Sequence, residues 1–176
     1  MLNNDLSQQI KRNFPYKPTE EQENAVKSFA EFLFSPSADS VFLMKGYAGT
    51  GKTTLISALV RTLDSLQRKV ILLAPTGRAA KVFSGYAGHP AYTIHKKIYR
   101  QKVFSNETDN FVANQNLHRN TLFIVDEASM IANEGLSGGH FGSGRLLDDL
   151  VQYVYNGLGC RLMLIGDTAQ LPPIGE

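Results

Sequence analysis

The sequence has little cysteine, no long apolar run and little net charge. Its one cysteine, Cys160, excludes an internal disulfide framework and a cysteine-rich zinc site, and we expect it to be a small buried residue at the start of a strand. No apolar run approaches the roughly 18 residues that a membrane span needs. The N-terminal segment lacks the apolar stretch of a secretory signal. These absences predict a cytoplasmic protein that does not contact a membrane.

Positive and negative charges nearly balance, with 18 lysines and arginines against 16 aspartates and glutamates and a net charge of +2. An excess this small does not by itself indicate a nucleic-acid partner. Hydrophobic residues make up 43% of the 176 residues and charged residues 19%. This composition excludes wholesale disorder and predicts a packed core of about one domain.

Four apolar runs without polar alternation predict strands that are buried on both faces. They are VFLMKG, KVILLAPT, TLFIVDEA and CRLMLIGD. Helices are predicted over about 4–14, 20–34 and 52–67, in GRAAKVFSGYA, and in RLLDDLVQYVYNG, where Gly157 takes the C-terminal position that favours glycine. TIHKKIYRQKV predicts a further helix or a turn, and FSNETDNFVANQN a small hairpin or a flexible insertion. Strands that alternate with helices predict an α/β fold, with a parallel sheet between helices on both faces and a ligand at the carboxyl ends of the strands.

A glycine-rich segment after the first predicted strand matches the phosphate-binding pattern G-x-x-x-x-G-K-[ST] at every fixed position. Glycines let such a loop curl so that its backbone N–H groups converge on phosphates, and the following helix adds the positive end of its dipole. Lys52 is expected to bridge the β- and γ-phosphates of ATP, and the Thr53 hydroxyl to hold Mg²⁺. The candidate nucleotide-binding residues are Gly46, Tyr47, Ala48, Gly49, Thr50, Gly51, Lys52, Thr53 and Thr54.

Two carboxylates, Asp126 and Glu127, follow the third predicted strand. We expect Asp126 to hold Mg²⁺ through its water shell. Glu127 would orient and polarise the attacking water as a general base. A pair of acids in a turn is weak evidence alone, but after a phosphate loop it favours nucleotide hydrolysis over transfer to another acceptor.

Taken in order along the chain, GYAGTGKTT, APTGRAAK, TIHKKIY, VDEASM and IGDTAQLPPIG resemble the motifs of superfamily 1 helicases of the RecD type. The resemblance runs from about Thr19 to the last residue, and the combination is far more specific than the phosphate loop alone. It implies a P-loop NTPase domain of RecA-like fold, the first motor domain of an enzyme that hydrolyses ATP and moves along single-stranded DNA from 5′ to 3′. Residues 1–18 are then an N-terminal extension and residues 19–176 the motor domain.

Two glutamines acquire roles from this resemblance. Gln22 resembles the glutamine that reads adenine, because its amide can both donate to and accept from the base edge. Gln22 also stands three residues after Thr19, and closing a capping box there is the alternative role. Gln170 resembles a motif III glutamine that contacts the γ-phosphate region and couples it to DNA, on a loop that Asp167 helps to hold.

Two further segments resemble DNA-contacting motifs of the family. The candidate residues are Pro75, Thr76, Arg78, Lys81, His95, Lys96, Lys97 and Arg100. A hydroxyl and backbone N–H groups at a strand end can meet DNA phosphates, and the cations would add a phosphate track. The alternatives are a solvated helix face for the cations and a core-facing, hydrogen-bonded role for His95.

RecD-type helicases also need a second RecA-like domain, which supplies an arginine finger and the other half of the DNA track. The chain stops at LPPIGE, before such a domain, so we expect a fragment of a longer protein whose own hydrolysis is feeble. Oligomeric state has no signal in the sequence. Two rival functions are a P-loop kinase, whose arginine-rich lid is not visible here, and a nucleotide-regulated DNA-binding module without unwinding activity.

Overall fold

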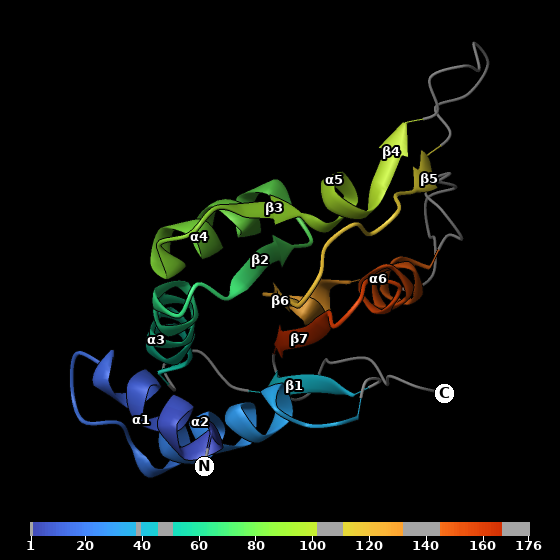
Figure 1. Cartoon of the computed structure of the whole chain (residues 1–176). Helices are drawn as coiled ribbons and strands as arrows, with labels where there is room; N and C mark the ends of the chain where they lie inside the picture. The colour runs from blue at the N-terminus through green and yellow to red at the C-terminus, as the bar shows by residue number, and fades with distance from the viewer. Residues whose placement is uncertain (1, 38–39, 46–50, 102–110, 132–144, 167–176) are drawn as a thin grey trace.

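Five strands of the computed structural model form one sheet, in which every neighbouring pair is parallel. Their order is β1-β7-β6-β2-β3 (Figure 1). These strands are β1 (Val41–Lys45), β2 (Lys69–Ala74), β3 (Ala91–Thr93), β6 (Thr121–Val125) and β7 (Arg161–Gly166). A separate antiparallel pair is formed by β4 (Tyr99–Gln101) and β5 (Phe111–Ala113). The structure describes residues 2–37, 40–45, 51–101, 111–131 and 145–166.

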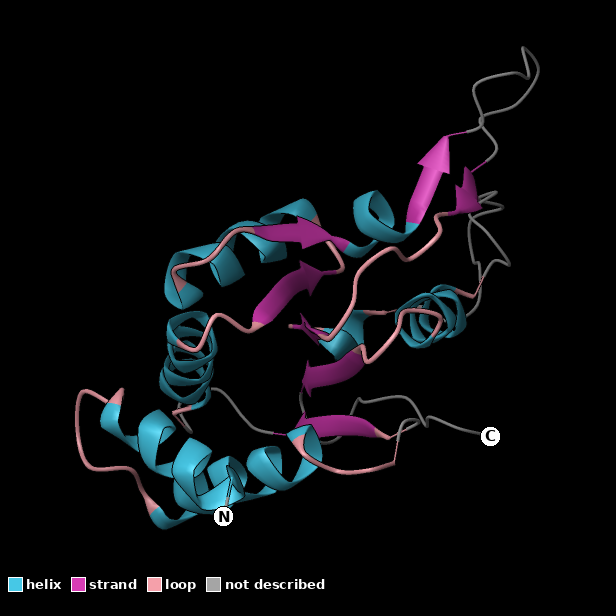
Figure 2. Cartoon of the chain, in the orientation of Figure 1, coloured by secondary structure: helices cyan, strands magenta, loops and turns pink. Residues whose placement is uncertain are grey.

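Helices cover both faces of the sheet, as the pattern of alternating elements predicted (Figure 2). One face is covered by α2 (Glu20–Leu33), α3 (Lys52–Ser65) and α4 (Gly77–Ala87), and α1 (Leu2–Arg12) packs on α2 and α3 in the same core. The other face packs against α5 (Ile94–Ile98), α6 (Leu146–Tyr155) and the short 3-10 helix η1 (Ala128–Met130). The period of two in a strand divides β6 between these cores, with Leu122 and Ile124 on the first face and Phe123 and Val125 on the second. The parallel α/β sheet is therefore confirmed.

The N-terminal extension packs onto this domain. Leu6, Ile10 and Phe14 are buried in the same apolar core as Val26 of α2 and Leu59 of α3. Buried apolar side chains of this size each stabilise a fold by about 1.5–3 kcal/mol, so α1 is an integral part of the first core. In the described part of the chain, no helix combines the length and the apolar character required to cross a membrane.

Side-chain caps fix the starts of three helices. Thr19 forms the predicted capping box with Gln22 at the start of α2. Thr76 caps α4 by accepting a hydrogen bond from the amide of Ala79, and Thr93 caps α5 in the same way. Helix α3 begins differently, since its N-cap is Gly51 at φ 79°, and no side chain among the described residues caps it. Its first-turn N–H groups are therefore available to another acceptor.

Three details differ from the expectations or extend them. Strand β3 has only three residues, too few for a periodic signal, and TIHKKIYRQKV divides between α5 and β4 because the chain turns there into the β4–β5 hairpin. Gly157 follows Asn156, the C-cap of α6, as predicted, but its φ is not positive, so the left-handed helix ending that usually favours glycine is absent. Position 157 has no room for a larger residue, because a Cβ there would lie 2.4 Å from Nδ2 of Asn116 and 2.7 Å from Sγ of Cys160. Cys160 is buried next to β7, as predicted.

Candidate active site

The polar clusters that follow the strands share one edge of the sheet. Because all five strands are parallel, their carboxyl ends point the same way. The end of β1 leads into the phosphate-binding segment and the end of β6 into Asp126, and only β7 separates these two strands. Strand β2, on the other side of β6, leads into Pro75 and Thr76. The topology thus gathers the predicted clusters at a single edge.

The described part of the phosphate-binding segment lies at the start of α3. Gly51 adopts the left-handed conformation that glycine tolerates best, and Lys52, Thr53 and Thr54 form the first helical turn. This turn contains no acidic residue, and Lys52 is half-buried whereas Thr53 is exposed. A helix start with uncapped N–H groups, a lysine and no acid fits an anion such as a phosphate. Gly46, Tyr47, Ala48, Gly49 and Thr50 lie outside the described residues.

Gln22 connects the start of α2 to the start of α3. Its Oε1 accepts a hydrogen bond from the amide of Thr19 at 2.9 Å, which closes the capping box. Its Nε2 donates to the carbonyl of Gly51 at 3.1 Å and to the hydroxyl of Tyr16 at 3.2 Å. The side chain is only 3% exposed, and hydrogen bonds from Gln22 and Thr54 lower the pKa of Tyr16. Both donors of the amide are thus engaged, so donation to a base requires the release of Tyr16 or Gly51.

Asp126 is a buried carboxylate, 5% exposed, that is held on several sides. Its Oδ1 accepts from the amide of Glu127 at 2.8 Å, and its own amide donates to the carbonyl of Leu73 at 3.0 Å. Its Oδ2 accepts from the hydroxyl of Tyr86 at 2.5 Å. A carboxylate offers about four acceptor positions, so lone pairs remain for a further partner on each oxygen.

Glu127 lies next to this buried acid and is exposed to solvent. Its φ of 54° places it in the left-handed region, where a residue with a Cβ is uncommon. The strand therefore ends in one fixed, buried carboxylate followed by one accessible carboxylate. That arrangement suits the metal-holding and water-polarising roles expected of the two acids, because only the second can reach a solvent molecule freely.

Tyr86 was not anticipated from the sequence, since it is separated from Asp126 by 40 positions. It is half-buried near the end of α4, and its ring stacks on that of Phe83 with centroids 5.3 Å apart. Burial, followed by the negative charge of Asp126, raises the pKa of Tyr86 far above its usual value. The phenol is therefore a hydrogen-bond donor to Asp126 at any physiological pH.

A cavity of about 280 Å³ lies beside the first turn of α3. It is lined by Asn13, Pro15, Thr53, Thr54, Ser57, Arg61 and Tyr86. The cavity is thus bordered by the N-terminal segment, by Thr53, the candidate magnesium ligand, and by Tyr86, which donates to Asp126. Its lining combines polar and apolar surface.

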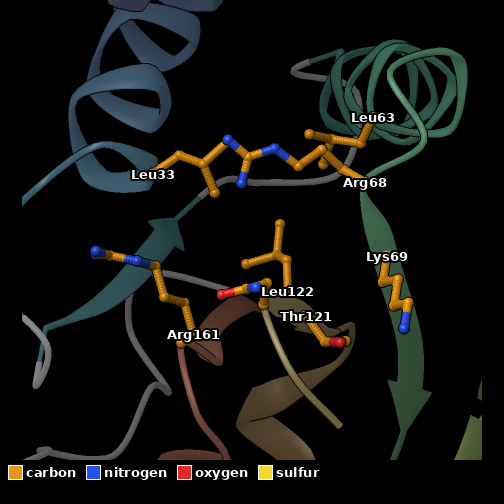
Figure 3. Close-up of a pocket in the computed structure, with 9 residues that line it drawn as sticks. Leu33, Leu63, Arg68, Lys69, Thr121, Leu122 and Arg161 are labelled. Atoms are coloured by element: carbon orange, nitrogen blue, oxygen red, sulfur yellow. The ribbon is translucent and has the colours of Figure 1, made fainter.

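A second cavity lies at the opposite edge of the sheet and measures about 30 Å³ (Figure 3). Residues at or next to the amino ends of β2, β6 and β7 line it, and Arg68 reaches across it toward Leu33. The guanidinium of Arg161 donates to the carbonyls of Phe32, Ser35 and Ser37. This cation therefore satisfies backbone acceptors at and just after the end of α2. None of the predicted site residues contributes to this cavity.

The two candidate DNA-contacting segments lie side by side, because Ala74 at the end of β2 pairs with Thr93 at the end of β3. Thr76 and Arg78 are exposed at the start of α4. Tyr92 is 41% exposed. The Nζ atoms of Lys96 and Lys97 lie 6.0 and 5.9 Å from the centre of the Tyr92 ring. If a strand had been predicted over Ala91–Thr93, Tyr92 would have been placed on the face opposite its two neighbours. Three residues are too few for such a periodic signal to be recognised in the sequence.

His95 is half-buried, with its ring centre 5.6 Å from that of Tyr99, and burial lowers its pKa. Both interpretations of His95 therefore stay predictions. The side chain of Arg100, together with Asp167 and Gln170, lies outside the described residues.

Comparisons with known proteins agree with this geometry. Residues 17–176 match the family described as AAA domain. The chain is 31% identical over 146 residues to the ATP-dependent RecD2 DNA helicase of Deinococcus radiodurans, covering 82% of this chain and 18% of that protein. It is 30% identical over 139 residues to the ATP-dependent DNA helicase Pif1 of Bdellovibrio bacteriovorus, covering 78% of this chain and 30% of that protein.

A crystal structure of the Pif1 helicase from Candida albicans shares the fold, with a TM-score of 0.51 and 21% identity over 91% of this chain and 34% of that one. The expected α/β P-loop fold of RecA-like type is thereby confirmed, and so is the resemblance to helicases of the RecD type. The chain spans less than a third of the length of each of the two curated relatives.

Proposed function

The chain belongs to the AAA domain family, and from this premise we propose that it is the ATP-binding and ATP-hydrolysing motor domain of a DNA helicase that moves 5′ to 3′ on single-stranded DNA. One observation carries the proposal. The uncapped start of α3, with Lys52 and Thr53, lies at the same sheet edge as the buried Asp126 and the exposed Glu127. The relatives named as ATP-dependent DNA helicases support the same assignment.

The donor set fits ATP and Mg²⁺. Lys52 would pair with the β- and γ-phosphates, and the Thr53 hydroxyl and Asp126 would hold Mg²⁺, which neutralises phosphate charge when bound. Glu127 would accept a proton from the attacking water and orient it. The direct test is ATP turnover with and without single-stranded DNA. Transfer of phosphate to an acceptor other than water would instead indicate a kinase.

The domain boundaries and partners form part of this proposal. Residues 19–176 would be the first RecA-like domain and residues 1–18 its N-terminal extension. The partners would be single-stranded DNA and a second RecA-like domain, which in RecD-type helicases supplies the arginine finger. Gln170 would couple the γ-phosphate region to DNA. Because ATP and DNA meet inside the cell, we place the site of action in the cytoplasm.

Gln22 is expected to confer a preference for adenine. Replacing Gln22 with alanine should lower ATP affinity about 3- to 10-fold and bring the affinities for ATP and GTP closer together, because one or two neutral hydrogen bonds are lost. Competition of ATP and GTP for a fluorescent ADP analogue measures both effects.

The matched control is Thr19→Ala, which opens the same capping box but leaves the amide of Gln22 in place. Both variants should lose about 1 kcal/mol of stability. Only the Gln22 variant should change base selectivity. If GTP competes as well as ATP in the unaltered chain, Gln22 does not read the base.

The candidate DNA surface consists of Thr76, Arg78, Tyr92, Lys96 and Lys97. Cations and a hydroxyl contact the phosphate backbone, whereas an exposed aromatic ring can stack on an unpaired base. The net charge of +2 argues for weak binding by this chain alone, with a dissociation constant of about 10⁻⁴ to 10⁻⁶ M and little sequence preference.

Replacing Lys96 and Lys97 together with alanine should weaken binding to a labelled single strand. The slope of log affinity against log salt should become flatter by up to about 1.4, since each phosphate contact contributes about 0.7 on a single strand. The control replaces Arg12 and Lys27, two exposed cations of α1 and α2, and should leave the slope unchanged. An unaltered slope in the Lys96 and Lys97 variant would mean that these lysines are only a solvated helix face.

A further inference from the structure

Tyr86 donates a hydrogen bond to Asp126, although Tyr86 lies outside the segments that resemble motifs of the family. Its hydroxyl lies 2.5 Å from Oδ2 of Asp126, and it reaches this carboxylate from α4, which follows β2 and not β6. Side chains on a helix lean toward its N-terminus. Helix α4 begins at the carboxyl edge of the sheet, so the phenol of Tyr86 leans back toward that edge.

The ring of Tyr86 is held in place before it meets the carboxylate. It stacks on Phe83, which is fully buried, with an angle of 30° between the ring planes. The next residue, Ala87, is buried in the first core. The donor therefore has a fixed position, and the hydrogen bond that it makes restricts the rotation of the Asp126 side chain.

The hydrogen bond from Tyr86 limits the number of acceptor positions that the Asp126 carboxylate can offer to another partner. Oδ1 is bound to the amide of Glu127 and Oδ2 to Tyr86, so each oxygen keeps about one acceptor position. Tyr86 also lines the 280 Å³ cavity together with Thr53, the other candidate magnesium ligand. The fixed donor and this ligand thus border one space.

We propose that Tyr86 is a positioning residue that orients the Asp126 carboxylate so that its remaining lone pairs face the hydration shell of Mg²⁺. This inference rests on the proposed function, because it assumes that Asp126 helps to hold the metal. Partners that orient a metal-holding group typically contribute about 10- to 100-fold to metal affinity. Tyr86 acts through Asp126 and need not touch the nucleotide.

The test compares ADP binding with and without metal by calorimetry. The quantity measured is the ratio of the ADP dissociation constant in EDTA to that in saturating Mg²⁺. Tyr86→Phe removes only the hydroxyl, so it should leave metal-free ADP binding within about twofold and reduce the ratio by about tenfold. A purely structural role for Tyr86 would change both affinities together or neither.

The matched control is Tyr99→Phe. The Tyr99 hydroxyl donates to Oδ2 of Asp149 at 2.6 Å, a buried bond of the same kind that joins β4 to α6. Tyr99→Phe should lower the stability of the fold and leave the ratio of the two ADP dissociation constants unchanged. In an Asp126→Asn background, Tyr86→Phe should cause no further loss of the ratio, because the group that it orients no longer holds the metal.

The outcomes are distinct. An unchanged ratio in Tyr86→Phe, with Mg²⁺ still strengthening ADP binding in the unaltered chain, overturns the inference and leaves the proposed function standing. A further loss in the Asp126→Asn background also overturns it, since Tyr86 would then act by another route. If the unaltered chain binds ADP equally with and without Mg²⁺, the proposed magnesium site itself is wrong.

Discussion

Alanine in place of Lys52 is expected to lower the affinity for Mg–ATP and Mg–ADP by about 100-fold. A hydrogen bond between charged groups contributes up to about 3 kcal/mol, and the lysine would make more than one to the phosphates. Lys52 is half-buried in the first turn of α3, so its ammonium group is less screened than one on an open surface. Calorimetric titration of both nucleotides measures the loss.

A suitable control for this experiment is Lys69→Ala. Lys69 is exposed at the start of β2, at the edge of the sheet opposite the candidate site, and its replacement changes the net charge by the same amount. Nucleotide affinity should be unaffected. Equal binding by the unaltered chain and Lys52→Ala would remove the phosphate-loop assignment.

Glutamine at position 127 should separate nucleotide binding from hydrolysis. The amide preserves the size of Glu127 but cannot accept a proton from water, so DNA-stimulated turnover should fall by about 10²-fold or more while ATP affinity stays constant. Turnover should be measured in the intact protein, because in RecD-type helicases the arginine finger comes from a second domain.

The comparison variant for turnover is Glu31→Gln, which makes the same chemical change at an exposed position on α2. It should behave like the unaltered protein in both binding and turnover. Near-normal turnover of Glu127→Gln would show that another residue positions the water.

Local signals account for what the sequence predicted well. The strands of the main sheet are apolar runs bounded by turns, except for β3, and the helices that cover them carry regular apolar spacing. The strand before the phosphate-binding motif and the helix after it are among these elements, because the motif and its neighbours are contiguous in the sequence. The capping box of Thr19 and Gln22 likewise depends on residues three positions apart.

Contacts between distant segments could not be predicted in this way. The bond from Gln22 to Gly51 spans 29 positions and that from Tyr86 to Asp126 spans 40. Each depends on how helices pack, which one sequence does not specify. The reason for glycine at 157 has the same origin, because it arises from the closeness of Asn116 and Cys160 and not from a left-handed helix end. The roles of all the candidate site residues, from the phosphate-binding segment to Gln170, stay predictions.

The left-handed backbone of Glu127 has a consequence for the evolution of this domain. A residue with a Cβ at such a position costs about 1 kcal/mol or more, which glycine would recover. With the role proposed for Glu127, selection for stability and selection for turnover would oppose each other at this position. A library varied at this codon and sorted only for thermal resistance should become enriched in glycine and asparagine. The same library, selected in cells whose growth depends on ATP hydrolysis by this protein, should return glutamate.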